Sequence, residues 1–264
     1  MPTATADGAA VHYTTRGTGP ALVLVAGTGL TAEITYGHLV PAFTDRRTAV
    51  LPDYAGSGAT TEPAGELTVE ILANQIAAVA EAAGDGPVDL VGYSLGAVVA
   101  AAVAATHTHL VRRVVLVAGW PSSDDARMVL LNDVWQGLER LDHDLFNKFL
   151  QLNVFSTGFL SAIGHDGMTQ LLAGAPPITE GMRRHMALDR VADVRELLPK
   201  ITAPTLVIGL THDQVVPIEH ARALHAAIPG SRFAEIESGH GVVFERPDEL
   251  VSALREFLFT ESAY

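Results

Sequence analysis

A serine with a glycine two residues away on either side is the first candidate for chemistry in this chain. The pentapeptide Gly-Tyr-Ser-Leu-Gly at 92–96 follows an apolar stretch, residues 87–91, and precedes an alanine-rich stretch, residues 97–105. The apolar stretch is typical of a buried parallel strand, and the alanine-rich stretch is typical of a helix. A turn between them is too sharp for side chains at the two glycines and projects the serine from the sheet. The spacing therefore predicts Ser94 as a nucleophile at a helix N-terminus.

A serine hydroxyl needs a base to become a nucleophile, and the base needs a group that orients it. His240 lies between two glycines, directly after the last predicted strand, and Asp213 follows the strand before that one. Loops that follow parallel strands lie at the same edge of a sheet, so both side chains are expected beside Ser94. The sequence thus predicts a Ser94, Asp213, His240 triad in which His240 is the base.

Other acidic and histidine residues are alternatives. Asp53 could replace Asp213 as the acid, and so could Asp124 or Asp125, which follow the strand before the central segment. His212 is interpreted as a polar loop residue. Three further histidines are expected on solvated helices of the central segment: His143, His165 and His185. No H-E-x-x-H or comparable ligand cluster occurs, so no metal site is predicted.

Alternating strands and helices must position these side chains. Two strand-like segments around residues 7–8 predict a hairpin. Apolar strands are then predicted at 21–25, 48–51, 87–91, 114–118, 204–209 and 232–236. Helices are predicted between and after them, at 35–43, 67–83, 97–105, 218–228 and 247–259. This alternation predicts an α/β fold with a mostly parallel sheet and helices on both faces.

The alternation stops between residues 120 and 200, where only helical patterns occur. Apolar residues recur there at helical spacings, and the Ala-Pro-Pro at 175–177 breaks the segment in two. We interpret residues 120–200 as a helical cap inserted into an α/β core formed by residues 1–119 and 201–264.

Composition restricts the classes of function. The 264 residues include no cysteine, which excludes disulfides and thiolate chemistry, and the net charge of −13 argues against nucleic acid or an anionic membrane as a partner. The N-terminal residues have neither a basic region nor an apolar core, so we expect a cytoplasmic protein without a signal peptide. No phosphate-binding loop of the G-x-x-x-x-G-K type is present, and no cofactor is predicted.

Together these motifs resemble those of the α/β-hydrolase family, and the likeness covers nearly the whole chain. Residues 92–96 match the family's nucleophile turn, and residues 213–217 resemble its D-x-x-V-P acid loop. Residues 239–247 resemble its histidine loop and last helix, and residues 53–58 resemble its structural D-x-x-G-x-G turn. Four motifs in the family's order are far more specific than one.

The resemblance also implies an oxyanion hole. In the family it consists of the amide after the nucleophile, here Leu95, and an amide from the loop after the first apolar strand, here Thr28. Family members usually have a histidine at the position of Ala26, so this chain departs from the pattern. The Thr28 hydroxyl is expected either to add a hydrogen bond to the oxyanion or to cap the turn. Substrate contacts are expected from three residues near these motifs: Tyr93, Trp120 and Val242.

The resemblance implies a serine hydrolase that cleaves a small or medium, mostly apolar carboxylic ester or lactone. The same triad serves thioesterases, cofactor-free perhydrolases and carbon–carbon bond hydrolases, and the motifs do not separate them. A non-hydrolytic biosynthetic enzyme or a ligand sensor is the alternative from another class, since a fold does not fix a function. The oligomeric state stays open.

Overall fold

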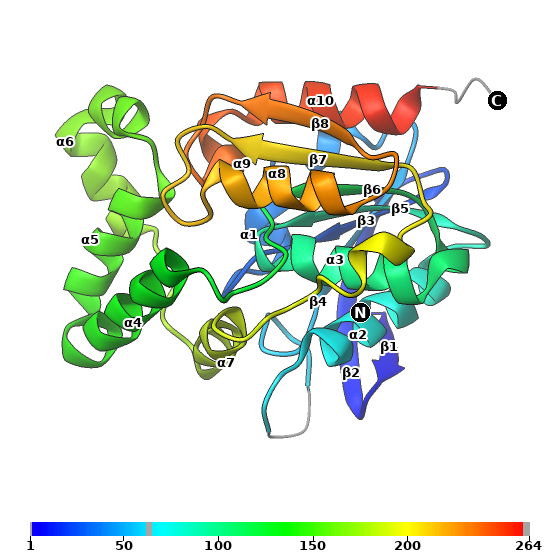
Figure 1. Cartoon of the computed structure of the whole chain (residues 1–264), viewed down its shortest axis with the longest axis horizontal. Helices are drawn as coiled ribbons and strands as arrows, with labels where there is room; N and C mark the ends of the chain where they lie inside the picture. The colour runs from blue at the N-terminus through cyan, green and yellow to red at the C-terminus, as the bar shows by residue number, and fades with distance from the viewer. Residues whose placement is uncertain (1, 62–64, 261–264) are drawn as a thin grey trace.

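A sheet of eight strands crosses the centre of the molecule in the computed structural model, which describes residues 2–61 and 65–260 (Figure 1). Its strand order is β1-β2-β4-β3-β5-β6-β7-β8. The strands are β1 (Thr3–Ala6), β2 (Ala9–Gly17), β3 (Ala21–Val25), β4 (Thr48–Asp53), β5 (Val88–Tyr93), β6 (Val111–Val117), β7 (Thr205–Leu210) and β8 (Arg232–Ile236). The strands from β3 onward pair in parallel, whereas β1 and β2 are antiparallel to their neighbours.

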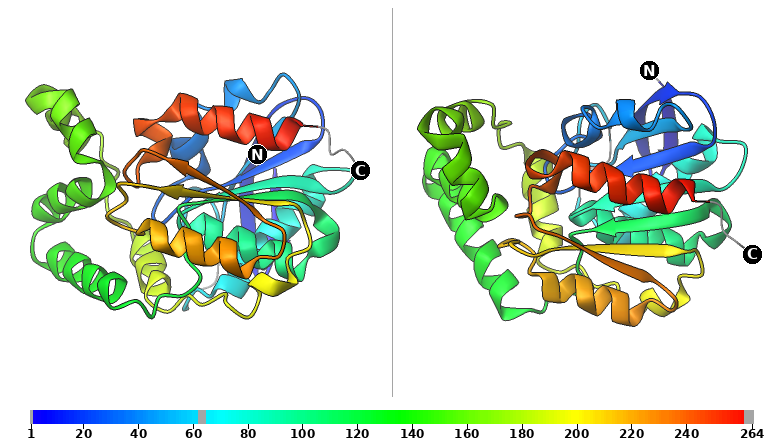
Figure 2. Two further views of the ribbon diagram at one scale, coloured as in Figure 1. Left: turned by 45° about the horizontal axis from the view of Figure 1, so that its top comes forward. Right: turned by 90° about the horizontal axis from the view of Figure 1, so that it is seen from above.

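Helices cover both faces of this sheet (Figure 2). They are α1 (Ala32–Tyr36), α2 (Val69–Ala83), α3 (Leu95–Thr106), α8 (Ile218–Ala227), α9 (Val242–Glu245) and α10 (Pro247–Phe259). Short 3-10 turns accompany them at Val40–Ala42, Thr108–Leu110 and Leu198–Lys200. The predicted α/β fold with a mostly parallel sheet is confirmed.

The two-residue period of a strand explains how one sheet supports two cores. In β3, Val23 and Val25 face the core beneath α2, α3 and α8, while Leu22 and Leu24 face the core beneath α1, α9 and α10. All four side chains are fully buried. A continuous apolar run in the sequence is therefore what a strand with two covered faces requires.

Most element boundaries agree with the sequence prediction. The hairpin turn lies at Asp7 and Gly8, both with positive φ, and α2 begins after Thr68, whose hydroxyl accepts a hydrogen bond from the amide of Ile71 at 3.1 Å. The predicted helix at 35–43 is wrong. Because Thr31 caps the chain earlier and Pro41 lacks an N–H, the segment forms the short α1 and a separate 3-10 turn.

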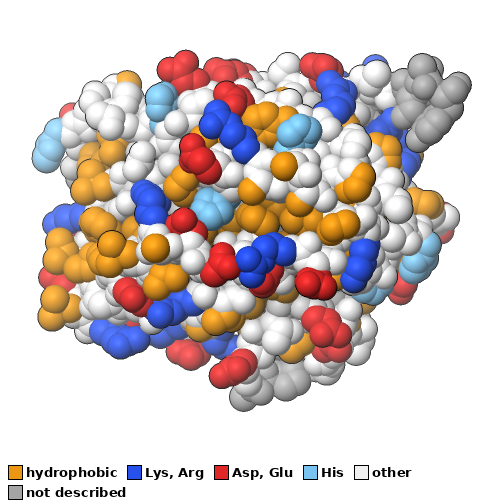
Figure 3. All heavy atoms as spheres, in the orientation of Figure 1, with side chains coloured by type: hydrophobic (Ala, Val, Ile, Leu, Met, Phe, Trp, Pro, Cys, Tyr) orange, Lys and Arg blue, Asp and Glu red, His pale blue; other side chains and the backbone are white. Residues whose placement is uncertain are grey.

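Four helices between β6 and β7 pack over the end of the sheet at the left of Figure 1. They are α4 (Ala126–Leu141), α5 (His143–Val154), α6 (Thr157–Ala173) and α7 (Glu180–Asp189), and we call them the cap helices. They fill the segment predicted as a cap, while its division from the core at residues 120 and 200 stays a prediction. Large hydrophobic side chains reach the surface on these helices, among them Leu130, Leu141 and Leu152, and Figure 3 shows apolar atoms gathered there. Within residues 2–61 and 65–260, every helix is too short or too polar to cross a membrane.

Candidate active site

The turn between β5 and α3 holds Ser94 in an unusual backbone conformation. Its φ is 57° and its ψ is −123°, a combination that L-residues rarely adopt. The flanking glycines permit the turn, because a Cβ on Gly92 would lie 2.1 Å from the carbonyl oxygen of Gly96, and one on Gly96 would lie 2.3 Å from that of Val25. The strained turn presents the Ser94 side chain at the sheet edge and places it directly before the first residue of α3.

Ser94, His240 and Asp213 form a hydrogen-bonded chain. The Ser94 Oγ lies 3.0 Å from His240 Nε2, and His240 Nδ1 lies 2.7 Å from Asp213 Oδ2. Since an ionised carboxylate only accepts, Nδ1 carries the proton and Nε2 presents its lone pair to the serine hydroxyl. The structure therefore brings the three predicted residues together in the arrangement that activates a serine.

Backbone groups fix the acid and the base in this chain. Asp213 Oδ1 accepts hydrogen bonds from the amides of Val215 and Val216, each at 2.8 Å, so only Oδ2 remains for the imidazole. The hydroxyl of Tyr93 donates to the carbonyl of His240 at 2.8 Å. The acid loop and the nucleophile strand thus both hold His240 in place.

The histidine loop also contacts the cap helices. The amide of Gly241 donates to the carbonyl of Val154, at the end of α5, at 2.8 Å. The buried carboxylate of Glu245 accepts from the amide of Gly239 at 3.2 Å and from the amide and hydroxyl of Ser156, which caps α6. One carboxylate therefore ties the loop that carries His240 to the start of α6.

Two backbone amides are candidates for binding an oxyanion. Leu95 is the first residue of α3, where amides have no acceptor within the helix and the helix dipole favours negative charge. Thr28 follows β3, the neighbouring strand, and its loop borders the same cavity as Ser94. A Cβ on Gly27 would lie 3.0 Å from the Cβ of Ser94, which shows how closely this loop approaches the serine.

The Thr28 hydroxyl has a partner that the sequence did not suggest. It donates to Asp189 Oδ2 on α7 at 2.7 Å, so both predicted roles, an oxyanion contact and a turn cap, are wrong. Asp189 is buried, and burial raises the pKa of its carboxyl to about 7, opposed by the Thr28 hydrogen bond and the charge of nearby His240. A cap residue therefore sets the orientation of the predicted oxyanion loop.

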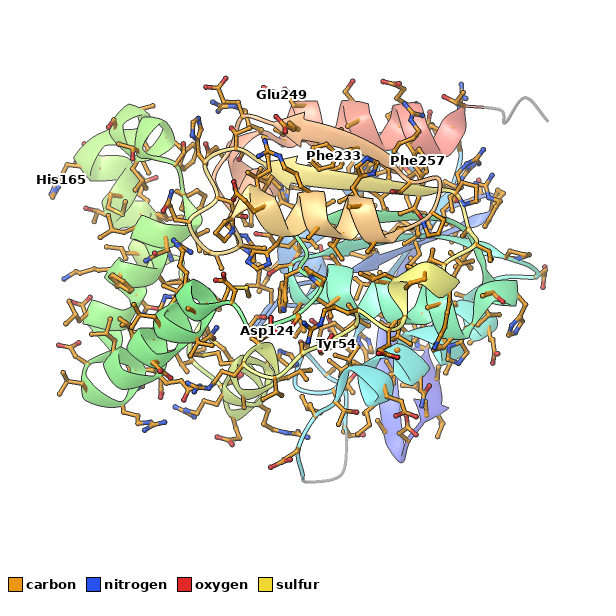
Figure 4. All side chains as sticks on the ribbon, viewed as in Figure 1. Tyr54, Asp124, His165, Phe233, Glu249 and Phe257 are labelled. Carbon is orange, nitrogen blue, oxygen red and sulfur yellow. The ribbon has the colours of Figure 1, made fainter. Side chains whose placement is uncertain are left out.

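A second residue of α7 binds the same loop. His185 accepts a hydrogen bond at Nδ1 from the amide of Gly29 at 3.1 Å, and its Nε2 donates to the carbonyl of Ala55 at 2.7 Å. The prediction that His185 is solvated is wrong, because its side chain is fully buried and burial lowers its pKa to about 4. His143 and His165 are exposed as expected, and Figure 4 shows His165 at the outer end of α6.

The close packing of α7 explains why its side chains reach the loops. A Cβ on Gly181 would lie 1.9 Å from the carbonyl oxygen of Gly56, so this helix contacts the loop after β4 backbone to backbone. His185 and Asp189 are four residues apart and lie on the same side of the helix. That spacing of a histidine and an aspartate is the sequence signal for both residues, of which the sequence prediction includes only His185.

A cavity of about 460 Å³ lies between the sheet edge and the cap helices, bordered by Ser94, His240 and Thr28. Tyr93 and Trp120 also lie on its wall, as expected. Val242 does not, because its side chain is buried in the core beneath α9, so the substrate contact predicted for it is wrong. Most of the wall is contributed by apolar side chains, many of them from the cap helices.

The alternative acids lie elsewhere. Asp53 accepts from the amide of Ala32 at 3.0 Å, and Asp125 caps α4. Asp124, which is labelled in Figure 4, pairs with Arg195 at the surface. His212 is exposed, as expected. In the part of the chain that the structure describes, no group of three or more His, Asp or Glu side chains is placed to hold a metal ion.

Comparisons with known proteins place this geometry in a wider context. The chain is 42% identical over 255 residues to a pyrrolizixenacetamide deacetylase from Xenorhabdus hominickii, an alignment that covers 96% of each protein. A thermophilic esterase from Thermogutta terrifontis superposes with a TM-score of 0.80 at 25% identity, covering 97% of this chain and 96% of the esterase. An esterase from Exiguobacterium antarcticum superposes with a TM-score of 0.85 over 98% of each chain at 22% identity, a likeness of fold.

A family model described as the alpha/beta hydrolase family matches residues 22–253, which include the nucleophile turn, the acid loop and the histidine loop. With its eight-stranded sheet and this match over most of its length, the chain belongs to the alpha/beta hydrolase family.

Proposed function

We propose that this hydrolase cleaves a small or medium, mostly apolar carboxylic ester or lactone through an acyl-enzyme on Ser94. The observation that carries the proposal is the hydrogen-bonded chain from Ser94 through His240 to Asp213 at the wall of the cavity. The hydrolase names of its relatives support the reaction class. The cavity's largely apolar wall favours an apolar acyl or leaving group.

The reaction needs two proton transfers through His240. As Ser94 Oγ attacks the acyl carbon, its proton moves to His240 Nε2, and Asp213 stabilises the charged imidazole. The bond from the acyl carbon to the leaving oxygen then breaks, and that oxygen takes the proton from His240. Water repeats the sequence in the second half: its oxygen bonds to the acyl carbon, its proton passes through His240, and Ser94 leaves with that proton. Water is the only co-reactant.

The amides of Leu95 and Thr28 are proposed to bind the negative oxygen that forms in each tetrahedral intermediate. A backbone donor does not depend on the missing histidine at Ala26, so the hole survives that departure from the family pattern. Removing one donor of such a hole typically lowers turnover by about 100- to 1000-fold. Positioning of Thr28 by α7 is therefore part of the proposed mechanism.

Amide deacylation is a second candidate, and one comparison favours it. The relative that is 42% identical over 96% of this chain is named as a deacetylase of an acetamide. The same triad cleaves amides when the leaving nitrogen receives the proton from His240. The two candidates share the acyl-enzyme on Ser94.

A fluorophosphonate probe tests the acyl-enzyme directly. Intact mass is expected to show one adduct on the protein, no adduct on Ser94→Ala, and much slower labelling of Asp213→Asn and His240→Ala. Short p-nitrophenyl esters provide the turnover assay for the same variants. Absence of labelling and of ester cleavage in the folded protein would sink the proposal in favour of a binding role for the cavity.

A further inference from the structure

The side chain of Gln151 on α5 lies buried at the cavity wall without a hydrogen-bond partner. Only 9% of the residue is exposed, and neither atom of its amide group is hydrogen-bonded within residues 2–61 and 65–260. These atoms are accessible, unlike the sealed Oδ1 of Asn132, and the residue borders the cavity. Because a buried carboxamide seldom stays unpaired, Gln151 takes its partner from whatever occupies the cavity, water in the free enzyme or a group of the substrate.

Asn147 adds a second carboxamide to the same wall. It lies four residues before Gln151, which places both side chains on one face of α5. Asn147 is half-buried, and its side chain also lacks a partner in the part of the chain that the structure describes. By contrast, Asn153 of the same helix does not border the cavity and donates to a carbonyl of α5 at 2.7 Å. The two unpaired carboxamides of α5 therefore coincide with its cavity face.

The end of α5 packs against the loop that carries His240. A Cβ on Gly239 would lie 2.8 Å from the carbonyl oxygen of Val154, so loop and helix meet backbone to backbone. Measured along the helix axis, Gln151 lies about 5 Å before Val154, and Asn147 lies about 10 Å before it. In the proposed mechanism His240 gives its proton to the leaving atom, so the wall beside its loop adjoins the part of the substrate that leaves.

The charges at the wall restrict the kind of polar group that fits there. Among the described residues that border the cavity, Asp189 and His240 are the only acidic or basic side chains, and none is Lys or Arg. A carboxylate or phosphate beside α5 would have no counter-ion, and burial of an unpaired charge is costly. A carboxamide offers both donors and an acceptor, so a neutral group with an N–H and a carbonyl matches it best.

We propose that Gln151 and Asn147 form a subsite for a neutral amide or lactam group in the leaving part of the substrate. The subsite rests on the proposed acyl-enzyme at Ser94 and adds that the leaving part carries this group some distance from the scissile bond. Gln151 Nε2 donates to the carbonyl of the group, its Oε1 accepts from the N–H, and Asn147 provides a further donor and acceptor. An alkyl group of the same shape would displace water from both carboxamides and leave them unpaired.

Two aryl acetates with the same scissile bond test the subsite. They are 4-acetamidophenyl acetate and 4-isobutylphenyl acetate, in which carbon atoms replace the N–H and the carbonyl oxygen of the amide. For each protein, kcat/KM for the first ester is divided by kcat/KM for the second, so the reactivity of the two phenols cancels when proteins are compared. Gln151→Met keeps the length of the side chain but removes its donors and acceptor, and it is expected to lower this ratio about 10-fold. Asn147→Leu should lower it by a smaller factor, because Asn147 is more exposed.

Gln136→Met is the matched control, because Gln136 belongs to the neighbouring cap helix α4 and does not border the cavity. Its ratio should stay within about 2-fold of that of the wild type. Labelling by the fluorophosphonate probe and cleavage of the isobutylphenyl ester report that each variant is folded and that Ser94 is active.

Equal ratios in the wild type and Gln151→Met would overturn the subsite and show that this carboxamide binds only water. Probe labelling of the wild type without cleavage of the acetamidophenyl ester would overturn it as well. Loss of both ester cleavage and probe labelling in the folded wild type would instead overturn the proposed function.

Discussion

The neutral imidazole of His185 makes the stability of this protein depend on pH in a way that can be calculated. Burial lowers the pKa of His185 from 6.5 to about 4. One pKa unit corresponds to about 1.4 kcal/mol, so this difference corresponds to about 3 kcal/mol of folding free energy. His185 also holds Gly29 and Ala55, and a protonated Nδ1 would face the Gly29 amide donor to donor.

The sign follows from proton binding. Between pH 6.5 and 4 the unfolded chain binds a proton at His185 that the folded protein does not, so acid favours unfolding across this window. Asp189 acts in the opposite direction, because burial raises its pKa to about 7 and its folded form holds a proton that the unfolded chain loses above about pH 4. The stability curve of the wild type alone therefore hides the contribution of His185.

His185→Gln isolates this contribution, since glutamine does not titrate and leaves Asp189 in place. Urea unfolding, followed by circular dichroism at about pH 7, 5.5 and 4, gives the free energy of unfolding of both proteins. At neutral pH the variant is expected to be less stable by about 1–3 kcal/mol, because one buried group loses its partner. At the acid end of the series the wild type should have lost about 3 kcal/mol relative to the variant, so the gap closes or reverses.

A gap that is the same at neutral pH and at about pH 4 would refute the reasoning. It would mean that His185 protonates in the folded protein as readily as in the unfolded chain, and therefore that its imidazole is not held neutral between the two backbone groups. The unfolding slopes of the two proteins should agree, which checks that the same surface is exposed in each case.

Other substitutions test separate parts of the structure. Gly96→Ala should reduce the free energy of unfolding by more than about 3 kcal/mol, because the new Cβ would meet the backbone of β3. Gly137→Ala lies at an open position of α4 and should instead stabilise the protein by about 0.5–1 kcal/mol. Thermal unfolding measures both effects. Glu245→Gln should lower kcat several-fold and change KM much less, because it loosens the loop that carries His240. A kcat equal to that of the wild type would contradict this role. Asp89→Asn should cost about 3–5 kcal/mol by leaving the buried Arg47 charge unpaired, while kcat per folded molecule stays unchanged because Asp89 lies near the opposite end of β5 from Ser94.

The sequence by itself determined the fold class and the residues at the sheet edge. Apolar runs bounded by glycine and proline specify strands with two covered faces. The glycines at 92 and 96 specify a turn that has no room for a side chain at those two positions. Because loops after parallel strands share one edge, the sequence alone predicts that Ser94, Asp213 and His240 lie together, and the hydrogen bonds between them confirm it. These predictions need only the pattern of neighbouring residues and the order of strands in a parallel sheet.

Only the tertiary structure decided what the cap contributes. The contacts of Thr28 with Asp189 and of Gly29 with His185 join residues more than about 150 positions apart, and no local pattern records such a pair. The same holds for Val242, whose place beside His240 in sequence says nothing about the side of α9 on which it lies. Chain neighbours fix secondary structure, whereas the partner of a buried polar group depends on how whole helices pack, because its hydrogen bonds form only once α7 lies against the sheet edge.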